Sequence, residues 1–80
     1  MKRSYSKELD YSKLIIELRV QMNVSQEELS RILDVSVISI SRWENGRTVP
    51  TKLDKAKLNK LFKEYNVELE KVEEFLWKKL

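Results

Sequence analysis

Apolar side chains recur every three or four residues along most of the chain, and each such run predicts a helix. The first helix is predicted to begin at Tyr11 and to end where Asn23 and Val24 break the pattern. Its apolar positions lie on one helical face and are expected to pack into the core: Tyr11, Leu14, Ile15, Leu18 and Met22. Residues 1–10 before it are mostly polar and are expected to form a flexible N-terminal segment.

Two short helices with a tight connection follow. Ser25 and Glu28 have the spacing of a capping box, in which each residue accepts a hydrogen bond from the other's backbone, so a helix is expected to begin there and end near Asp34. Ser36 begins the next helix, and Gly46 can end it in a left-handed conformation. The expected core positions of the pair are Leu29, Ile32, Leu33, Ile40 and Trp43. Two short helices joined in this way are typical of a helix-turn-helix, here at about residues 25–45.

Two more helices are predicted in the second half of the chain. Thr51 and Asp54 mark the start of a fourth helix and Asn66 its end. Its apolar positions are Leu58, Leu61, Phe62 and Tyr65, with support from Leu53 and Ala56. Residues 67–80 contain a fifth helix with an apolar stripe, at Leu69, Val72, Phe75, Leu76 and Leu80. Since no strand pattern is present, the sequence predicts an all-α fold of five short helices.

Composition and charge exclude several classes of function. The chain has 80 residues, a net charge of +3, no His and no Cys, so imidazole and thiolate chemistry is excluded and no metal or cofactor is expected. The carboxylates of Glu27, Glu28 and Glu44 have no nucleophile and base to work with, so the chain is not expected to be an enzyme. No apolar run is long enough to span a membrane and no signal peptide is present, so we expect a cytoplasmic protein.

Residues 11–50 resemble the Cro/cI-type helix-turn-helix domain, also called the XRE or lambda-repressor-like family. The matching segments are Leu18-Arg19, residues 24–29, residues 33–36, residues 40–46 and Pro50. The resemblance implies a five-helix DNA-binding fold that inserts its third helix into the major groove of DNA, with residues 11–66 as the helix-turn-helix domain and residues 67–80 as the C-terminal helix. It also implies dimers that bind inverted-repeat DNA sites. Most members have Gly in the turn where this chain has Asp34, a residue type that tolerates left-handed backbone.

The resemblance also implies which residues contact double-stranded DNA. Base edges are expected to meet Val37, Ile38, Ser41 and Arg42. The sugar–phosphate backbone is expected to meet Arg19, Gln26, Ser36, Asn45, Gly46 and Arg47. Arg19 has a second role open to it, an ion pair with Glu44 inside the domain. The lysines of the fourth helix are assigned only a general electrostatic role on its solvated side, at positions 52, 55, 57, 60 and 63.

These residues favour a sequence-specific, repressor-like transcriptional regulator, but other interpretations stay open. Residues 25–50 carry three basic and four acidic side chains, so the DNA assignment depends on individual residues rather than on charge. The apolar Val37 and Ile38 would also suit a protein-interaction module, such as an antitoxin or a bridging coactivator, and the chain could serve as the DNA-targeting domain of a larger protein. The last helix either packs on the domain or forms a homodimer through Leu69, Val72, Leu76 and Leu80.

Overall fold

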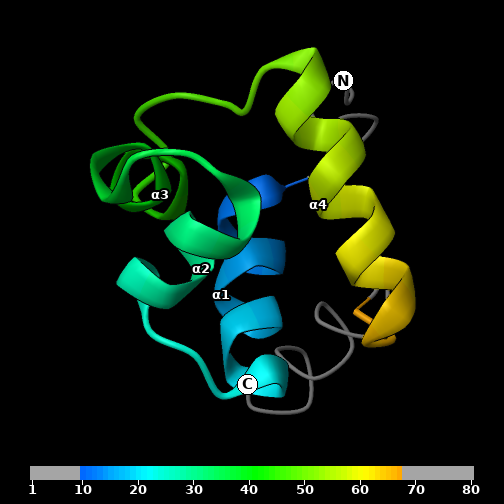
Figure 1. Cartoon of the computed structure of the whole chain (residues 1–80). Coiled ribbons are helices and arrows are strands. Elements are labelled where there is room, and N and C mark those ends of the chain that lie inside the picture. The colour runs from blue at the N-terminus through cyan, green and yellow to red at the C-terminus, as the bar shows by residue number, and fades with distance from the viewer. Residues whose placement is uncertain (1–9, 68–80) are drawn as a thin grey trace, which may run out of the picture.

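Four helices surround one core in the computed structural model, which describes residues 10–67 (Figure 1). They are α1 (Tyr11–Met22), α2 (Gln26–Leu33), α3 (Val37–Glu44) and α4 (Lys52–Glu64). The predicted all-α fold is confirmed, with helices at the first four predicted places. The predicted N-terminal segment and fifth helix, including its proposed dimer contacts Leu69, Val72, Leu76 and Leu80, lie outside the described residues.

Short polar side chains begin the helices as the sequence predicts. At α2 the capping box is complete: Ser25 Oγ accepts the Glu28 N–H at 3.0 Å, and the Glu28 carboxylate accepts the Ser25 N–H at 2.8 Å. At α4 the Thr51 hydroxyl accepts the Asp54 N–H at 3.2 Å and donates to the Asp54 carboxylate at 3.0 Å. Because these bonds join residues only three apart, the helix starts are set by local sequence.

Left-handed residues end the helices or follow their ends. Asn23, Asp34 and Asn66 have φ values of 58°, 60° and 59°, and Gly46 has 73°. The expectation that Asp34 takes the turn position usually held by Gly is therefore confirmed. Beyond this turn, the Val35 N–H bonds to the Ser30 carbonyl at 2.9 Å, which satisfies an α2 carbonyl left free at the helix end.

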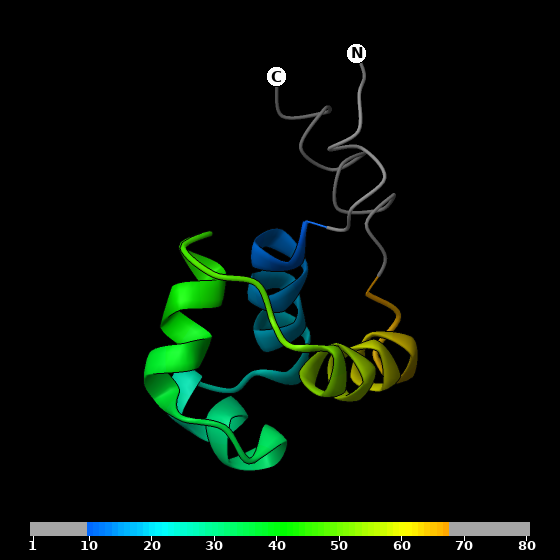
Figure 2. The ribbon, with the colours of Figure 1, turned by 90° about the horizontal axis from the view of Figure 1, so that it is seen from above.

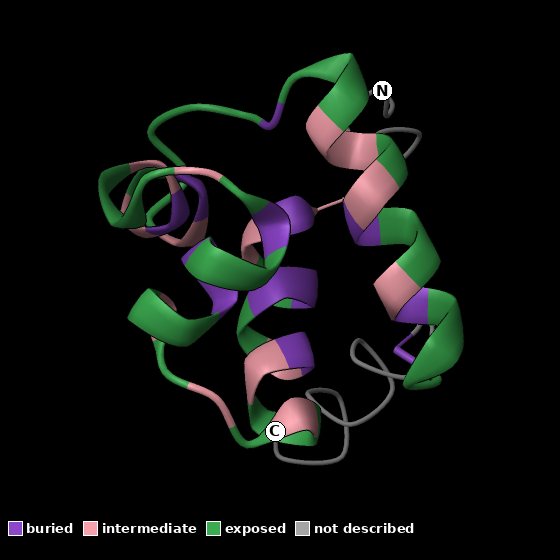
Figure 3. Cartoon of the chain, in the orientation of Figure 1, coloured by how far each residue is buried: buried purple, intermediate pink, exposed green. Residues whose placement is uncertain are grey.

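The core contains most of the predicted apolar positions (Figure 3). The side chains of Ile32, Leu53 and Tyr65 were expected inside but are exposed, as is Ala56, so these four predictions are wrong. On α2 the buried face consists of Leu29, Ser30 and Leu33, and the Ser30 hydroxyl donates to the Glu27 carbonyl at 2.7 Å. Ile32 lies outside this face and is exposed to solvent. The buried apolar side chains are Tyr11, Leu14, Ile15, Leu18, Leu29, Leu33, Ile40, Trp43, Leu58, Phe62 and Val67.

The packing of the helices leaves one side of α3 uncovered. α3 packs against α1 and α2, and α4 also packs against these two helices. Seen from above, α3 and α4 lie on opposite sides of α1, with α2 below them (Figure 2). The outward side of α3 therefore faces away from the rest of the described structure.

Two lysines of α4 do more than line its solvated side. Lys57 Nζ donates to the Leu33 carbonyl at 2.9 Å, and Lys55 Nζ lies 5.5 Å from the centroid of the Tyr11 ring. These two contacts were not predicted, and the general electrostatic role of the α4 lysines stays a prediction. Lys57 stabilises the C-terminal end of α2, where the helix dipole favours a cation.

Candidate nucleic-acid interface

One stripe of α3 contains all four residues that the resemblance assigns to base contacts. Val37 and Ser41 are one helical turn apart, as are Ile38 and Arg42, so the four side chains form two adjacent rows. Ile38 is 58% exposed, Val37 and Arg42 are also exposed, and Ser41 is half-buried. The structure therefore brings these four predicted residues together on one surface.

The opposite side of α3 anchors the helix in the core. Ile40 is completely buried, and Trp43 is buried three residues later on the same face. At the start of α3, the Ser36 hydroxyl accepts the Ser39 N–H at 3.1 Å and lies 3.0 Å from the Ser39 hydroxyl. These contacts fix the direction of the helix, so its outer stripe is presented in one orientation.

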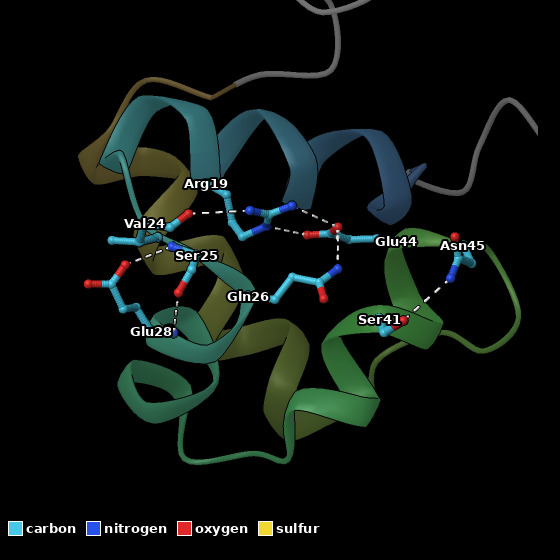
Figure 4. A network of polar contacts seen from close by, with 8 residues as sticks. All are labelled: Arg19, Val24, Ser25, Gln26, Glu28, Ser41, Glu44 and Asn45. Atoms are coloured by element: carbon cyan, nitrogen blue, oxygen red, sulfur yellow. Dashed lines mark hydrogen bonds and ion pairs between the residues drawn. The ribbon is translucent and has the colours of Figure 1, made fainter.

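A polar network connects α1, α2 and α3 at the base of this surface (Figure 4). The Glu44 carboxylate accepts two bonds from the Arg19 guanidinium, from Nε at 2.6 Å and from the second terminal nitrogen at 3.1 Å. It also accepts the Gln26 side-chain amide at 2.9 Å, and the other terminal nitrogen of Arg19 donates to the Val24 carbonyl at 3.3 Å. One carboxylate at the end of α3 thus holds the start of α2 in place.

The network assigns Arg19 the second of its two predicted roles. The hydrogen bond to Glu44 raises the pKa of Arg19, burial opposes this, and the charge of Glu44 adds to it. The guanidinium therefore stays charged and neutralises the one acidic side chain of α3. A phosphate contact by Arg19 stays a prediction, since its donors already have protein acceptors.

The start of α2 lies next to this network. Gln26, predicted to contact a phosphate, is the first residue of α2, and its amide donates one hydrogen to Glu44. An amide nitrogen carries two hydrogens, so the second is available for another acceptor. The free backbone N–H groups and the dipole at a helix start also favour an anion there.

The capping box makes the stability of α2 depend on pH. The backbone N–H and then the hydroxyl of Ser25 lower the pKa of Glu28. A lowered pKa means that this carboxylate stabilises the fold above its unfolded-state pKa of about 4.3, and that the contribution is lost as the pH falls through the lower folded-state pKa.

We expect Glu28→Gln to flatten part of the decline in stability between about pH 5 and pH 3. Urea unfolding followed by circular dichroism at several pH values measures it. Glu27→Gln, one residue earlier and also exposed, is the control, because Glu27 accepts no side-chain bond from Ser25. An equal flattening in both variants would contradict the role of the capping box.

Three of the residues predicted to contact the DNA backbone follow one another directly after α3: Asn45, Gly46 and Arg47. The Asn45 amide donates to the Ser41 hydroxyl at 3.4 Å, and Gly46 has a left-handed φ that a residue with a Cβ rarely adopts. The Arg47 N–H donates to the Arg42 carbonyl at 2.9 Å, which returns the chain toward the end of α3. Both Arg42 and Arg47 are exposed, and neither is in an ion pair within residues 10–67.

Two hydrogen bonds between residues of the candidate site were not predicted from the sequence: the bond from Gln26 to Glu44 and the bond from Asn45 to Ser41. The four-residue spacing of Ser41 and Asn45 was a usable signal, because side chains at that spacing meet on a helix. Gln26 and Glu44 are far apart in sequence, and no local pattern connects them.

Other kinds of site find no support in the part of the chain that the structure describes. Among residues 10–67 there is no group of acidic side chains that could hold a metal ion. Nor is any helix in that range sufficiently long and apolar to cross a membrane. The outer stripe of α3 and the residues beside it are therefore the candidate site.

Comparison with known proteins agrees with this geometry. A family model described as helix-turn-helix matches residues 15–72, which is most of the chain and includes α2, α3 and their turn. No curated protein and no solved structure matches the chain. The chain belongs to the Cro/cI-type helix-turn-helix family, whose members bind DNA.

Proposed function

We propose that this protein is a repressor-like transcriptional regulator that recognises a specific double-stranded DNA sequence with α3 in the major groove. The observation that carries the proposal is the division of α3 into two faces. Ile40 and Trp43 are buried, while Val37, Ile38 and Arg42 face outward. An α-helix fits the major groove, where each base pair presents a distinct pattern of donors, acceptors and methyl groups.

The side chains on the outer stripe suit direct contact with bases. Arg42 can donate two hydrogen bonds to O6 and N7 of a guanine. Val37 and Ile38 cannot hydrogen-bond, but they can pack on the methyl groups of thymine. The Ser41 hydroxyl accepts a bond from Asn45, and its own hydrogen remains available to a base acceptor.

Residues on both sides of the stripe suit the phosphates. Gln26 at the start of α2 has a free amide hydrogen, and Ser36 precedes the first turn of α3. Asn45, Gly46 and Arg47 follow α3 directly, so contacts there would fix the position of the helix along the groove. Glu44, the nearest carboxylate on α3, is neutralised by Arg19, which reduces its repulsion of phosphate.

Arg42 and Arg47 are expected to differ in how they affect binding. Arg42→Ala is expected to weaken binding to the preferred sequence by about 1–3 kcal/mol and to relax the preference, because a guanine contact is lost. Arg47→Ala is expected to weaken all sequences by similar factors and to reduce the salt dependence, because a phosphate contact is lost. Titrations of matched and scrambled duplexes at several salt concentrations measure both effects. Equal losses from both variants on every duplex would contradict these roles.

Selection from a randomised duplex pool tests the proposed function as a whole. The protein is mixed with the pool at about 0.15 M salt, and bound DNA is recovered and sequenced over several rounds. Enrichment of one short sequence is the expected result. Retention that is weak, sensitive to salt and without enrichment would contradict sequence-specific recognition, since phosphate contacts alone give that behaviour.

One observation favours a second function, the binding of a partner protein. Val37 and Ile38 are adjacent exposed apolar residues at the start of α3. Such a pair suits an apolar protein surface as well as thymine methyl groups. Stable capture of one partner protein, lost in Ile38→Ser and accompanied by no DNA enrichment, would favour this function over the first.

A further inference from the structure

The first turn of α3 presents apolar surface to solvent and contains no acidic side chain. Ile38 is 58% exposed and Val37 is 37% exposed, and the first turn of α3 has no acidic residue. The hydroxyls of Ser36 and Ser39, which flank this pair in the chain, lie 3.0 Å apart and hydrogen-bond to each other. This end of the helix can therefore cover a small apolar group, and it offers no carboxylate to a hydrogen-bond donor.

Arg42 extends this surface along the helix. It follows Ile38 by four residues, so the two side chains are neighbours in one row of the exposed stripe. Arg42 is exposed and takes part in no ion pair within residues 10–67, so its guanidinium is available to a ligand. A guanidinium is planar, with donors along its edge and a weakly hydrated face that stacks on other groups. One row of α3 thus combines an apolar side chain with a flat cation.

One feature of the major groove matches the apolar part of this row. Base edges present donors and acceptors there, and their one apolar group is the methyl group on C5 of thymine. A cytosine methylated at C5 carries the same group at the same ring position. Neighbouring bases of a strand lie about 3.4 Å apart and Cβ atoms one helical turn apart about 5–6 Å, so the long Arg42 side chain can span the difference. The row therefore fits a C5-methylated pyrimidine that is followed by a guanine.

We propose that Ile38 and Arg42 together recognise a pyrimidine–guanine step in which the pyrimidine carries a C5-methyl group. Ile38 packs on the methyl group. Arg42 donates to O6 and N7 of the guanine while the face of its guanidinium covers the same methyl group. The thymine–guanine step and the 5-methylcytosine–guanine step are then both bound, and the unmethylated cytosine–guanine step is disfavoured. This inference rests on the proposed function and defines the base modification to which α3 responds.

The consequence is that methylation of cytosine in the DNA site controls binding. An unmethylated cytosine gives Ile38 no apolar partner, and its N4 amino group meets no carboxylate on the first turn of α3. Addition of the methyl group brings apolar surface against Ile38 and removes it from water. We expect this to raise the affinity for a cytosine–guanine site by about fourfold for each methyl group contacted.

Two pairs of duplexes, each differing by a single methyl group, test the proposal. The duplexes contain the sequence enriched in the pool selection, varied only at its pyrimidine–guanine step. Thymine is compared with uracil, and 5-methylcytosine with cytosine, by titration with the full chain at constant salt. Loss of the methyl group is expected to weaken binding about fourfold in each pair. Uracil at a thymine outside the enriched sequence is expected to have no effect.

Three variants assign the methyl effect to this row of α3. Ile38→Ser is expected to reduce the effect in both pairs to less than about twofold. Arg42→Lys is expected to reduce it as well, because lysine keeps the charge but lacks the planar group that covers the methyl. Ile32→Ser is the matched control and is expected to keep the full effect, since Ile32 is 50% exposed on α2 and lies outside the candidate site. Each effect is a ratio of two affinities of one protein sample, so a loss of folded protein cancels.

The other outcomes overturn the proposal. An enriched sequence without a pyrimidine–guanine step contradicts it, as do equal affinities within both pairs. An effect in the thymine pair alone contradicts the binding of 5-methylcytosine, and an effect that survives in Ile38→Ser assigns the methyl group to another residue. Sequence enrichment without a methyl effect rejects this inference alone, whereas absence of any enrichment rejects the proposed function and the inference with it.

Discussion

Replacing Ile40 with alanine is expected to lower the free energy of unfolding by about 3 kcal/mol. Ile40 is completely buried and is one of only two buried residues on α3. The substitution removes apolar contacts and leaves a cavity that the surrounding side chains fill only in part. A domain of this size has a small total stability, so we expect the variant to be partly unfolded and to bind DNA weakly for that reason.

Ile38 provides a matched control on the same helix. It is 58% exposed, so Ile38→Ala is expected to change the free energy of unfolding by less than about 0.5 kcal/mol and yet to weaken binding to the preferred DNA. Urea unfolding measures stability, and titration at low temperature measures binding by the folded protein. Similar losses of stability in the two variants would contradict the assignment of opposite faces to Ile38 and Ile40.

The features that sequence predicts well here are those that neighbouring residues determine. The capping box of Ser25 and Glu28 and the left-handed turn at Asp34 each depend on bonds between residues a few positions apart. The exposed stripe of α3 follows in the same way, because burying Ile40 and Trp43 forces the opposite face outward. Helix positions and the exposed face of α3 could therefore be predicted from local sequence, whereas the DNA contacts assigned to that face came from the family resemblance and stay predictions.

The features that sequence predicts poorly are those that depend on packing between helices. The apolar pattern predicted that Ile32 and Leu53 lie in the core, but both side chains are exposed. Which residues at the edge of an apolar helix face are buried depends on where the neighbouring helix packs. Lys57 was predicted to be solvated because lysine usually is, whereas the free carbonyl of Leu33 on another helix gives it a partner. Val67, assigned to the C-terminal segment, is buried in the core, and its N–H donates to the Phe62 carbonyl at 2.8 Å.

Within the candidate site, too, contacts between helices could not be predicted from local sequence. The sequence left two roles open for Arg19, because its distance from Glu44 depends on how α1 and α3 pack. The structure places them in a bidentate ion pair and adds Gln26 to it. This arrangement makes Glu44 a positioning residue, because it acts on the proposed DNA contacts through Gln26 and through the orientation of α3.

Replacing Glu44 with alanine is expected to lower the free energy of unfolding by about 2–3 kcal/mol. The Glu44 side chain is 8% exposed and that of Arg19 is 26% exposed, so the variant leaves a largely covered guanidinium without its carboxylate. It also removes the acceptor of the Gln26 amide. Since Arg19 is not fully buried, water can solvate part of it, which keeps the expected cost below that of a fully buried pair. Urea unfolding measures the loss.

Two further variants separate the ion pair from a general effect of charge. Glu64→Ala removes an exposed carboxylate at the end of α4 and is expected to change stability by less than about 0.5 kcal/mol. Arg19→Met combined with Glu44→Leu replaces both charges with apolar groups and is expected to recover much of the stability, because no charge is then left unpaired. If the double variant is as unstable as Glu44→Ala, the cost comes from lost packing and not from the stranded guanidinium. Recovered stability with weakened DNA binding is the expected result, since Gln26 would still lack the carboxylate that orients it.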